Sequence, residues 1–210
     1  MALFEEAFSH GPYLYYHLLS GVDLTLKGNK YIHGFFEVNK GKEFVGYSLV
    51  NVSEFKNRVL YYYFFSRHQK TLFYHIISKV LVVLQKAFRI QRNFPYVFAY
   101  GSQWVSITND FVNYILSKGV DILFLYRKTT CCDEVFIQTL LLNSSFIENI
   151  YNKDDEFKSC VRKIDWNRGN PYVWTNDDFD ELMRSDAIFA RKFDNSDMEI
   201  VKRIKKGVME

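Results

Sequence analysis

Three groups of polar residues in the second half of the chain have types and spacing that suit a group-transfer reaction. Asp133 and Glu134 lie in TTCCDEVF, Arg168 lies in IDWNRGNP, and Arg191 and Lys192 lie in IFARKFD. A carboxylate can take the proton from an attacking hydroxyl, and cations can stabilise an anionic leaving group such as a diphosphate. The sequence therefore offers an acid–base group and two cationic groups for transfer to a hydroxyl.

The apolar patterns around these groups predict the elements that must position them. Residues 13–20, YLYYHLLS, have the aromatic and apolar density of a buried strand, and Gly21 follows at a turn. Asp23 then lies just past this strand, where α/β proteins usually place ligand-binding groups. The run 134–142 predicts a helix that carries the carboxylates in its first turn. We also expect short strands at 147–150, 160–164 and 187–189 and helices at 111–116, 177–183 and 198–206.

A long amphipathic helix is predicted near the middle of the chain, over residues 71–90. Apolar residues recur there at helical spacing from Leu72 to Phe88. No acidic residue occurs between Glu54 and Asp110, a stretch with many basic ones: Lys56, Arg58, Arg67, Lys70, Lys79, Lys86, Arg89 and Arg92. The basic side of the helix is either a solvated surface or a face that docks on a membrane. Nucleic acid is disfavoured, because no reader motif accompanies the charge.

Length and composition fit one large domain, 1–210, with a formal net charge of +3. The three cysteines, Cys131, Cys132 and Cys160, do not make a disulfide framework. For the vicinal pair we favour a role as small buried hydrophobes over a redox switch. The first residues carry acids and no long apolar run, so no secretory signal is visible, and no run suits a membrane-spanning helix. We therefore expect a cytoplasmic protein.

Five blocks of the sequence resemble the Core-2/I-branching glycosyltransferases in their order and spacing. This family includes β-1,6-N-acetylglucosaminyltransferases and the protein O-xylosyltransferases. The blocks are YYHLLSGVDLTLK (15–27), GSQWVSITNDFVNYIL (101–116), DEVFIQTLLLNSSF (133–146), IDWNRGNP (164–171) and IFARKFD (188–194). The resemblance implies an α/β fold of the Rossmann-like GT-A type, with a mixed sheet flanked by helices. It also implies that the family's first portion, a βαβ half that binds uridine, is absent from this chain.

The resemblance further implies inverting transfer of N-acetylglucosamine, or a related sugar such as xylose, from a UDP-sugar to a glycan or protein hydroxyl. Glu134 matches the catalytic base of the family, and Arg168, Arg191 and Lys192 match its contacts to the donor diphosphate. Because cationic side chains replace a metal in this family, no metal cofactor is expected. The resemblance places further residues at the donor and acceptor pocket: Asp23, Ser102, Gln103, Trp104, Asp133, Trp166 and Asn170.

Each of these residues also has a structural interpretation. Acids in a first helical turn stabilise the helix dipole, which is the alternative for Glu134. Asp178-Phe179-Asp180 has the pattern of a metal motif, but its spacing from Thr175 predicts a capping box, so we reject it as a metal site. For the whole chain, the alternative to an enzyme is an interaction module that keeps the fold without binding a donor.

Overall fold

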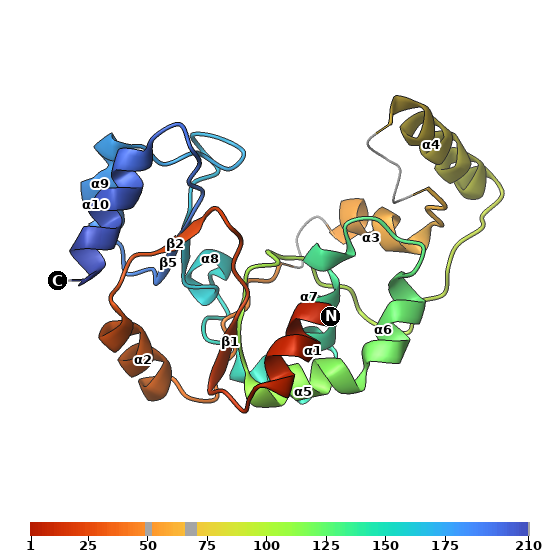
Figure 1. The fold of residues 1–210 in the computed structure, drawn as a ribbon. Helices are drawn as coiled ribbons and strands as arrows, with labels where there is room; N and C mark the ends of the chain where they lie inside the picture. Colours follow the sequence, from red (N-terminus) through yellow and green to blue (C-terminus); the bar gives the residue numbers. More distant parts are fainter. Residues whose placement is uncertain (49–51, 66–70, 210) are drawn as a thin grey trace. The chain divides into compact units, whose positions relative to one another are not determined.

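Small sheets and helices make up a mixed α/β structure (Figure 1). The computed structural model describes residues 1–48, 52–65 and 71–209. Their contacts divide the chain into two units. Unit 1 comprises Met1–Ala7, Tyr47–Gln103 and Asp110–Glu148, and unit 2 comprises Phe8–Gly46, Trp104–Asn109 and Asn149–Glu210. The expectation of a single domain over 1–210 stays a prediction. Arg67 and Lys70 of the basic stretch lie outside the described residues.

The strands of unit 2 form two small sheets. β1 (Tyr15–His17) pairs antiparallel with β3 (Ser106–Thr108). In the second sheet, β5 (Phe189–Arg191) lies in the middle, antiparallel to β2 (Asp23–Thr25) and parallel to β4 (Arg162–Ile164). Segments that are far apart in the sequence therefore meet at this mixed sheet.

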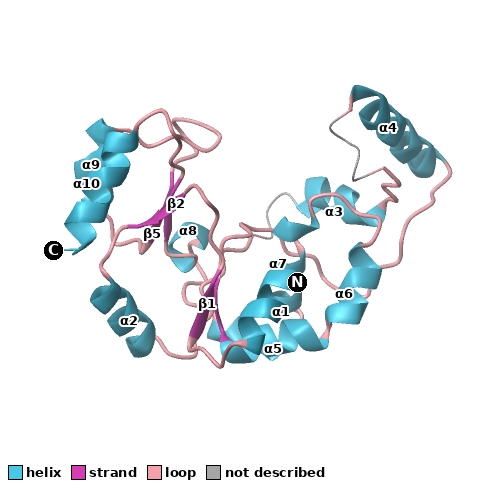
Figure 2. Cartoon of the chain, in the orientation of Figure 1, coloured by secondary structure: helices cyan, strands magenta, loops and turns pink. Residues whose placement is uncertain are grey.

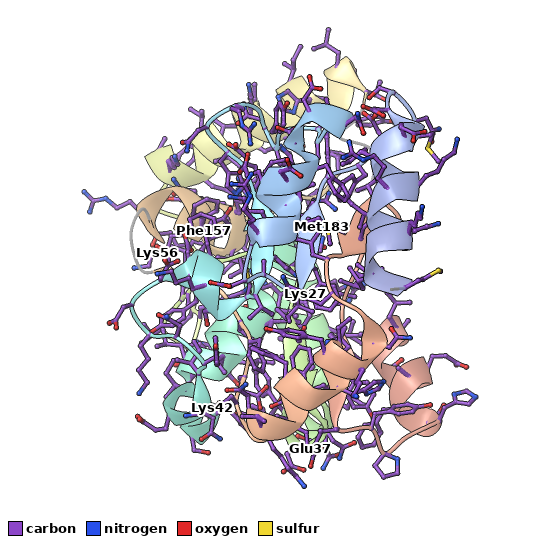
Figure 3. The ribbon with its side chains drawn as sticks, turned by 90° about the vertical axis from the view of Figure 1, so that its left-hand side faces the viewer. Lys27, Glu37, Lys42, Lys56, Phe157 and Met183 are labelled. Carbon is purple, nitrogen blue, oxygen red and sulfur yellow. The ribbon has the colours of Figure 1, made fainter. Side chains whose placement is uncertain are left out.

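Helices pack against these strands through apolar residues at helical spacing. In unit 2 they are α2 (Asn29–Val38), α8 (Glu156–Ser159), the 3-10 turn η4 (Asn176–Asp178), α9 (Phe179–Arg184) and α10 (Met198–Met209). Ile200 and Ile204, four residues apart on one side of α10, are fully buried in a cluster with Trp174 and Leu182. The side chain of Met183 lies between α9 and α10 (Figure 3). This packing fixes the segment between β4 and β5.

Unit 1 is built mainly from helices (Figure 2). They are α1 (Ala2–Ser9), α3 (Val52–Leu60), α4 (Leu72–Ala87), α5 (Asn109–Ser117), α6 (Gly119–Tyr126), the 3-10 turns η2 (Cys132–Glu134) and η3 (Ser145–Asn149), and α7 (Phe136–Leu142); α1, α5 and η3 cross its border by one or two residues. Val59, Phe98 and Val135 form a buried cluster against Tyr126. In the described part of the chain, the helices lack the length and apolar character needed to cross a bilayer.

Several predicted elements are confirmed. The long helix is α4, the predicted strand at 13–20 is the shorter β1, and the terminal helix is α10. The strand expected at 160–164 is β4, and the strand expected at 187–189 is β5, shifted by two residues.

Other expectations were wrong. Asp23 does follow the predicted strand, but it is the first residue of a further strand, β2, which was not expected. The carboxylates belong to the 3-10 turn η2, since the backbone at Val135 departs from helical angles and separates this turn from α7. Residues 147–150 form no strand; most of them lie in η3, where Phe146 packs on Phe111 with ring centroids 4.9 Å apart. Helices α3 and α6 were not expected at all.

Candidate functional site

Arg191 of unit 2 is held by a carboxylate on the neighbouring strand. Asp23 and Arg191 face each other in the register of β2 and β5. The Arg191 Nη1 atom lies 2.9 Å from Asp23 Oδ1, and it also donates to the Ser20 hydroxyl. The backbone N–H of Ser20 donates to the other Asp23 oxygen at 2.7 Å. These contacts fix the guanidinium at the end of the central strand β5, where the Arg191 side chain is 17% exposed and can be reached by a ligand.

Trp104 supplies a flat surface for the same guanidinium. The central carbon of the Arg191 guanidinium lies 3.9 Å from the centroid of the Trp104 ring, a cation–π contact with a nearly buried tryptophan. Trp104 precedes β3, so this residue reaches the site from a third part of the chain. Asp23, Trp104 and Arg191 were each predicted as site residues from the sequence, and the structure brings these three together.

A second arginine of this sheet, Arg162, was missed by the sequence analysis. Its side chain is buried at the start of β4 and donates to backbone carbonyls, including that of Val105 at 2.8 Å, and to the Ser106 hydroxyl. Burial lowers its pKa to about 10, and Asp23 acts in the opposite direction. The sequence signal that could have revealed it is an arginine within the strand predicted at 160–164, CVRKI.

The two arginines leave this part of unit 2 short of negative charge. Arg162 makes no ion pair with any carboxylate in the described residues, and Asp23 already serves Arg191. The Nε–H groups of both arginines are buried without a hydrogen-bond acceptor in the same described part. Buried donors of this kind are rare and call for an explanation. Arg191 is paired with Asp23 and Arg162 is not paired, so the two arginines carry an excess of positive charge. This excess produces a positive potential, which would attract an anionic ligand.

Lys192 follows Arg191 and has its backbone fixed by the segment after β4. Its carbonyl accepts from the Trp174 N–H at 3.0 Å, and the Trp174 indole donates to the Arg191 carbonyl at 2.7 Å. The Lys192 side chain is half-buried. Its charge adds to the lowering of the pKa of Asp194, which is due mainly to hydrogen bonds from Ser196. Lys192 therefore stands beside Arg191 and within electrostatic range of Asp194.

Arg168 lies in a different environment, with three carboxylates around a partly exposed guanidinium. It pairs with Asp165, with Asp178 at 2.8 Å and with Glu181 at 2.9 Å. The guanidinium also stacks on Tyr172, 4.4 Å from the ring centroid. This arrangement favours a role in holding the loop together, and the prediction that Arg168 binds a diphosphate stays a prediction. Two further predicted residues of this loop, Trp166 and Asn170, are exposed.

The predicted capping box at Thr175 is confirmed. The backbone N–H and the hydroxyl of Thr175 both donate to Asp178, each at 2.9 Å. Asp178 therefore serves helix capping and Arg168 rather than standing free as a ligand. Among the side chains that the structure describes, no group of three or more His, Cys, Asp and Glu residues is arranged to hold a metal ion.

The predicted base, Glu134, lies in unit 1 and is oriented by an arginine. Arg58 of α3 donates to Glu134 Oε2 at 3.1 Å, and both side chains are about one-third exposed. The Arg58 guanidinium lies over the ring of Phe55, which stacks in turn on Tyr100. The stack holds Arg58 in place and so orients one carboxylate oxygen of Glu134. Arg58 was counted only as part of a basic segment in the sequence, because its pairing joins residues 76 positions apart.

The loop at Ser102 is joined to the Glu134 segment by two hydrogen bonds. Gly101 N–H donates to the Glu134 carbonyl at 3.0 Å, and the Gln138 amide donates to the Ser102 carbonyl at 2.7 Å. The predicted residue Ser102 is therefore held near the turn that carries the carboxylate, and Gln103 is the next residue in the chain. Asp133, beside the base, is exposed.

The vicinal cysteines do not have the buried role expected of them. Cys131 is exposed and adopts a left-handed backbone with φ of 48°, and Cys132 is half-buried. Burial raises the pKa of the Cys132 thiol. Only Cys160, in unit 2, is a buried cysteine. The backbone turn at Cys131 directs its side chain to solvent, which the apolar character of the residue could not predict.

The predicted site residues are thus shared between the units. Unit 1 contains Ser102, Gln103, Asp133 and Glu134, and unit 2 contains Asp23, Trp104, Trp166, Arg168, Asn170, Arg191 and Lys192. A cavity of about 810 Å³ in unit 2 lies elsewhere, beside β1 and α2, and is lined by Tyr15, His17, Phe36, Glu37 and Phe189 among others. The predicted site residues do not line it.

Comparison with known families gives an independent assignment. The family model described as Core-2/I-branching enzyme matches residues 2–184, which is most of the chain. The match includes Asp23, Trp104 and Glu134 and ends before β5, so Arg191 and Lys192 lie beyond it. A comparison with curated proteins gave no match. On the extent of the family match, this chain belongs to the Core-2/I-branching enzymes, a family of glycosyltransferases.

Proposed function

We propose that this protein is an inverting glycosyltransferase of the GT-A type. In this proposal it transfers N-acetylglucosamine, or a related sugar such as xylose, from a UDP-sugar to a hydroxyl of a glycan or protein. Family membership supports the reaction class. The observation that carries the proposal is the meeting of Asp23, Trp104 and Arg191 in unit 2, because it builds a fixed cationic group from three separate parts of the chain.

The reaction would be a single displacement. The acceptor oxygen attacks the anomeric carbon of the donor sugar, the bond from that carbon to the diphosphate oxygen breaks, and UDP leaves with the bonding electrons. Glu134 would take the proton of the acceptor hydroxyl as this bond forms. The contact from Arg58 to Oε2 supports this role, since it orients the carboxylate while the Oε1 atom accepts no hydrogen bond within the described residues.

Charge on the leaving UDP would be stabilised by side chains. Arg191 presents a planar fork suited to phosphate oxygens, and Lys192 provides a point charge beside it. Arg162 contributes to the potential from below the surface, where the low dielectric strengthens its effect. With cations in these places, the proposed reaction requires no divalent metal to hold the diphosphate.

The alternative is a protein that keeps the fold without binding a donor. The environment of Arg168 favours it at one point, because three carboxylates already neutralise that side chain. The two functions differ in one measurable property, the binding of UDP to the full chain.

Isothermal titration with UDP tests the proposal directly. We expect the unaltered chain to bind UDP and Arg191→Ala to bind at least about tenfold more weakly, since hydrogen bonds to charged groups each contribute about 1.5–3 kcal/mol. Arg184→Ala is the matched control. Arg184 also lies in unit 2, but its side chain is 81% exposed and its ion pair with Asp180 is long, at 4.0 Å. Absence of UDP binding by the unaltered chain would establish the alternative function.

A further inference from the structure

Helix α4 of unit 1 is attached to its surroundings through polar residues. The Gln85 side chain is buried, accepts from the Tyr62 N–H at 2.8 Å and donates to the Tyr62 carbonyl at 3.1 Å. Ser78, two turns earlier on the same side, is also buried. Because Gln85 makes hydrogen bonds to both backbone groups of Tyr62, it fixes which side of α4 faces the rest of unit 1.

Because Gln85 and Ser78 lie on the inward side of α4, the apolar side of this helix faces outward. The exposed apolar residues of the helix fall on one strip of about a third of its circumference, given 100° per residue. We call this strip the outer face; its members include Leu72 (73% exposed), Phe73, Ile76, Val80, Val83 (63%) and Leu84. A helix in water normally turns such residues toward a core. An exposed apolar face of this extent is typical of a binding surface.

Positive charge borders the outer face. Lys79 and Lys86, seven residues apart and therefore on one side of the helix, are both exposed next to it. Arg89 is exposed just after the helix, and no acidic residue occurs anywhere between Glu54 and Asp110. Arg92, in contrast, is turned inward, where it donates to the carbonyls of Val59 and Leu125. The charge that α4 and its flanking described residues place beside the outer face is thus cationic.

We propose that the outer face of α4 docks on the surface of an anionic lipid membrane. An apolar strip bordered by lysines is the composition of helices that lie in the membrane interface, where the apolar residues enter the acyl boundary and the lysines contact anionic head groups. The strip is a convex ridge along one helix, and a bilayer takes in a ridge without needing a matching groove. This inference is independent of the transferase proposal, since it uses only α4 and its neighbours.

Vesicle sedimentation with the full chain tests this inference. Vesicles of phosphatidylcholine mixed with phosphatidylserine should bind the protein, and vesicles of phosphatidylcholine alone should bind it more weakly. Ile76→Asp and Val80→Asp should each weaken binding about tenfold or more, because a charge replaces an exposed apolar side chain that would enter the acyl boundary of the membrane. Lys79→Gln should weaken binding about fivefold, and only on the anionic vesicles.

Controls separate docking from damage to the fold. Val38→Asp places the same charge on an exposed valine of α2, 86% exposed in unit 2, and should leave vesicle binding unchanged. Circular dichroism should show that all variants keep the same helix content. Equal binding of Val80→Asp and the unaltered chain would overturn the proposal. So would a dimer in sedimentation equilibrium that Val80→Asp dissociates while vesicles bind neither form, because a second copy would then be the occupant of the outer face.

Discussion

Asp23 Oδ1 lies 2.9 Å from Arg191 Nη1, and the two residues occupy facing positions on β2 and β5. The carboxylate is almost fully buried, with 4% of its side chain exposed, and Arg191 is its ion-pair partner. Removing either member would leave a buried charge unpaired, which is costly. Any Arg191 variant that loses the positive charge, Arg191→Ala included, therefore needs a thermal-unfolding measurement beside its binding measurement, whereas Arg191→Lys keeps the charge.

Arg191→Lys should weaken UDP binding although it conserves the charge. A lysine ammonium can pair with Asp23. It lacks the planar guanidinium that lies over the Trp104 ring, and it cannot offer two parallel N–H groups to phosphate oxygens. We expect a loss of about tenfold in affinity, in the range for one hydrogen bond to a charged group. Titration calorimetry measures this loss, and thermal unfolding should show that the variant still folds. An affinity equal to that of the unaltered protein would contradict a bidentate contact to the diphosphate.

Glu134→Gln should abolish transfer and preserve donor binding. The amide has the shape of the carboxylate and can keep a contact with Arg58, but it cannot take the proton of the acceptor hydroxyl. Turnover should fall by about 10²–10⁴, as expected for loss of one acid–base group. Release of UDP in the presence of acceptor measures turnover, and calorimetry measures UDP affinity. Turnover close to normal would move the base to another group, with the exposed Asp133 as the next candidate.

Chelation should leave the reaction intact. If Arg191 and Lys192 stabilise the negative charge of the departing diphosphate, the rate of UDP release should be equal with and without EDTA. Replacement of both residues by alanine should reduce UDP binding more than acceptor binding. Activity that EDTA removes and Mn²⁺ restores would show that a metal takes this role, and would return attention to Asp178 and Asp180.

Arg168→Met should lower stability, mainly by leaving three carboxylates together. We expect a lower free energy of unfolding in urea, because removing one partner leaves charged hydrogen bonds unmade, although solvent screening reduces the effect at a side chain that is 39% exposed. Arg184→Met, at an 81% exposed position, should have little effect. UDP affinity of the folded variant tests the sequence prediction as well, because a diphosphate contact at Arg168 requires that affinity to fall.

Arg168→Met should also change how the free energy of unfolding depends on pH at low pH. The Arg168 backbone and guanidinium hydrogen bonds lower the pKa of Asp165 to about 2. Burial opposes the shift of Asp178, but hydrogen bonds from Thr175 and Arg168 prevail, so its pKa is also lowered. Since the folded carboxylates bind protons less readily than unfolded ones, their stabilisation is present above about pH 4 and is lost as the pH falls toward 2. Between about pH 4 and pH 2, the free energy of unfolding in urea should fall less steeply for Arg168→Met than for the unaltered chain. An equally steep fall in both proteins would contradict this prediction.

The sequence alone determined the family and a large share of the candidate site. The order and spacing of its motifs predicted the Core-2/I-branching family, and the family model confirms it. Apolar periodicity located α4 and α10, because helical spacing is a local property that the chain shows directly. Asp23, Trp104 and Arg191 could be named from their blocks before their contact was known.

Only the tertiary structure decided which partners these residues have. Arg58 meets Glu134, which is 76 positions away, and Arg162 is buried with no carboxylate paired to it among the described residues. Arg168 meets three carboxylates, of which only Asp165 is near it in the sequence. The outward side of α4 was likewise set by Gln85 and Tyr62, since periodicity shows that a helix has an apolar side but not what that side faces. Local patterns fix local elements, whereas pairing, burial and exposure depend on long-range contacts, which the order of residues alone does not show.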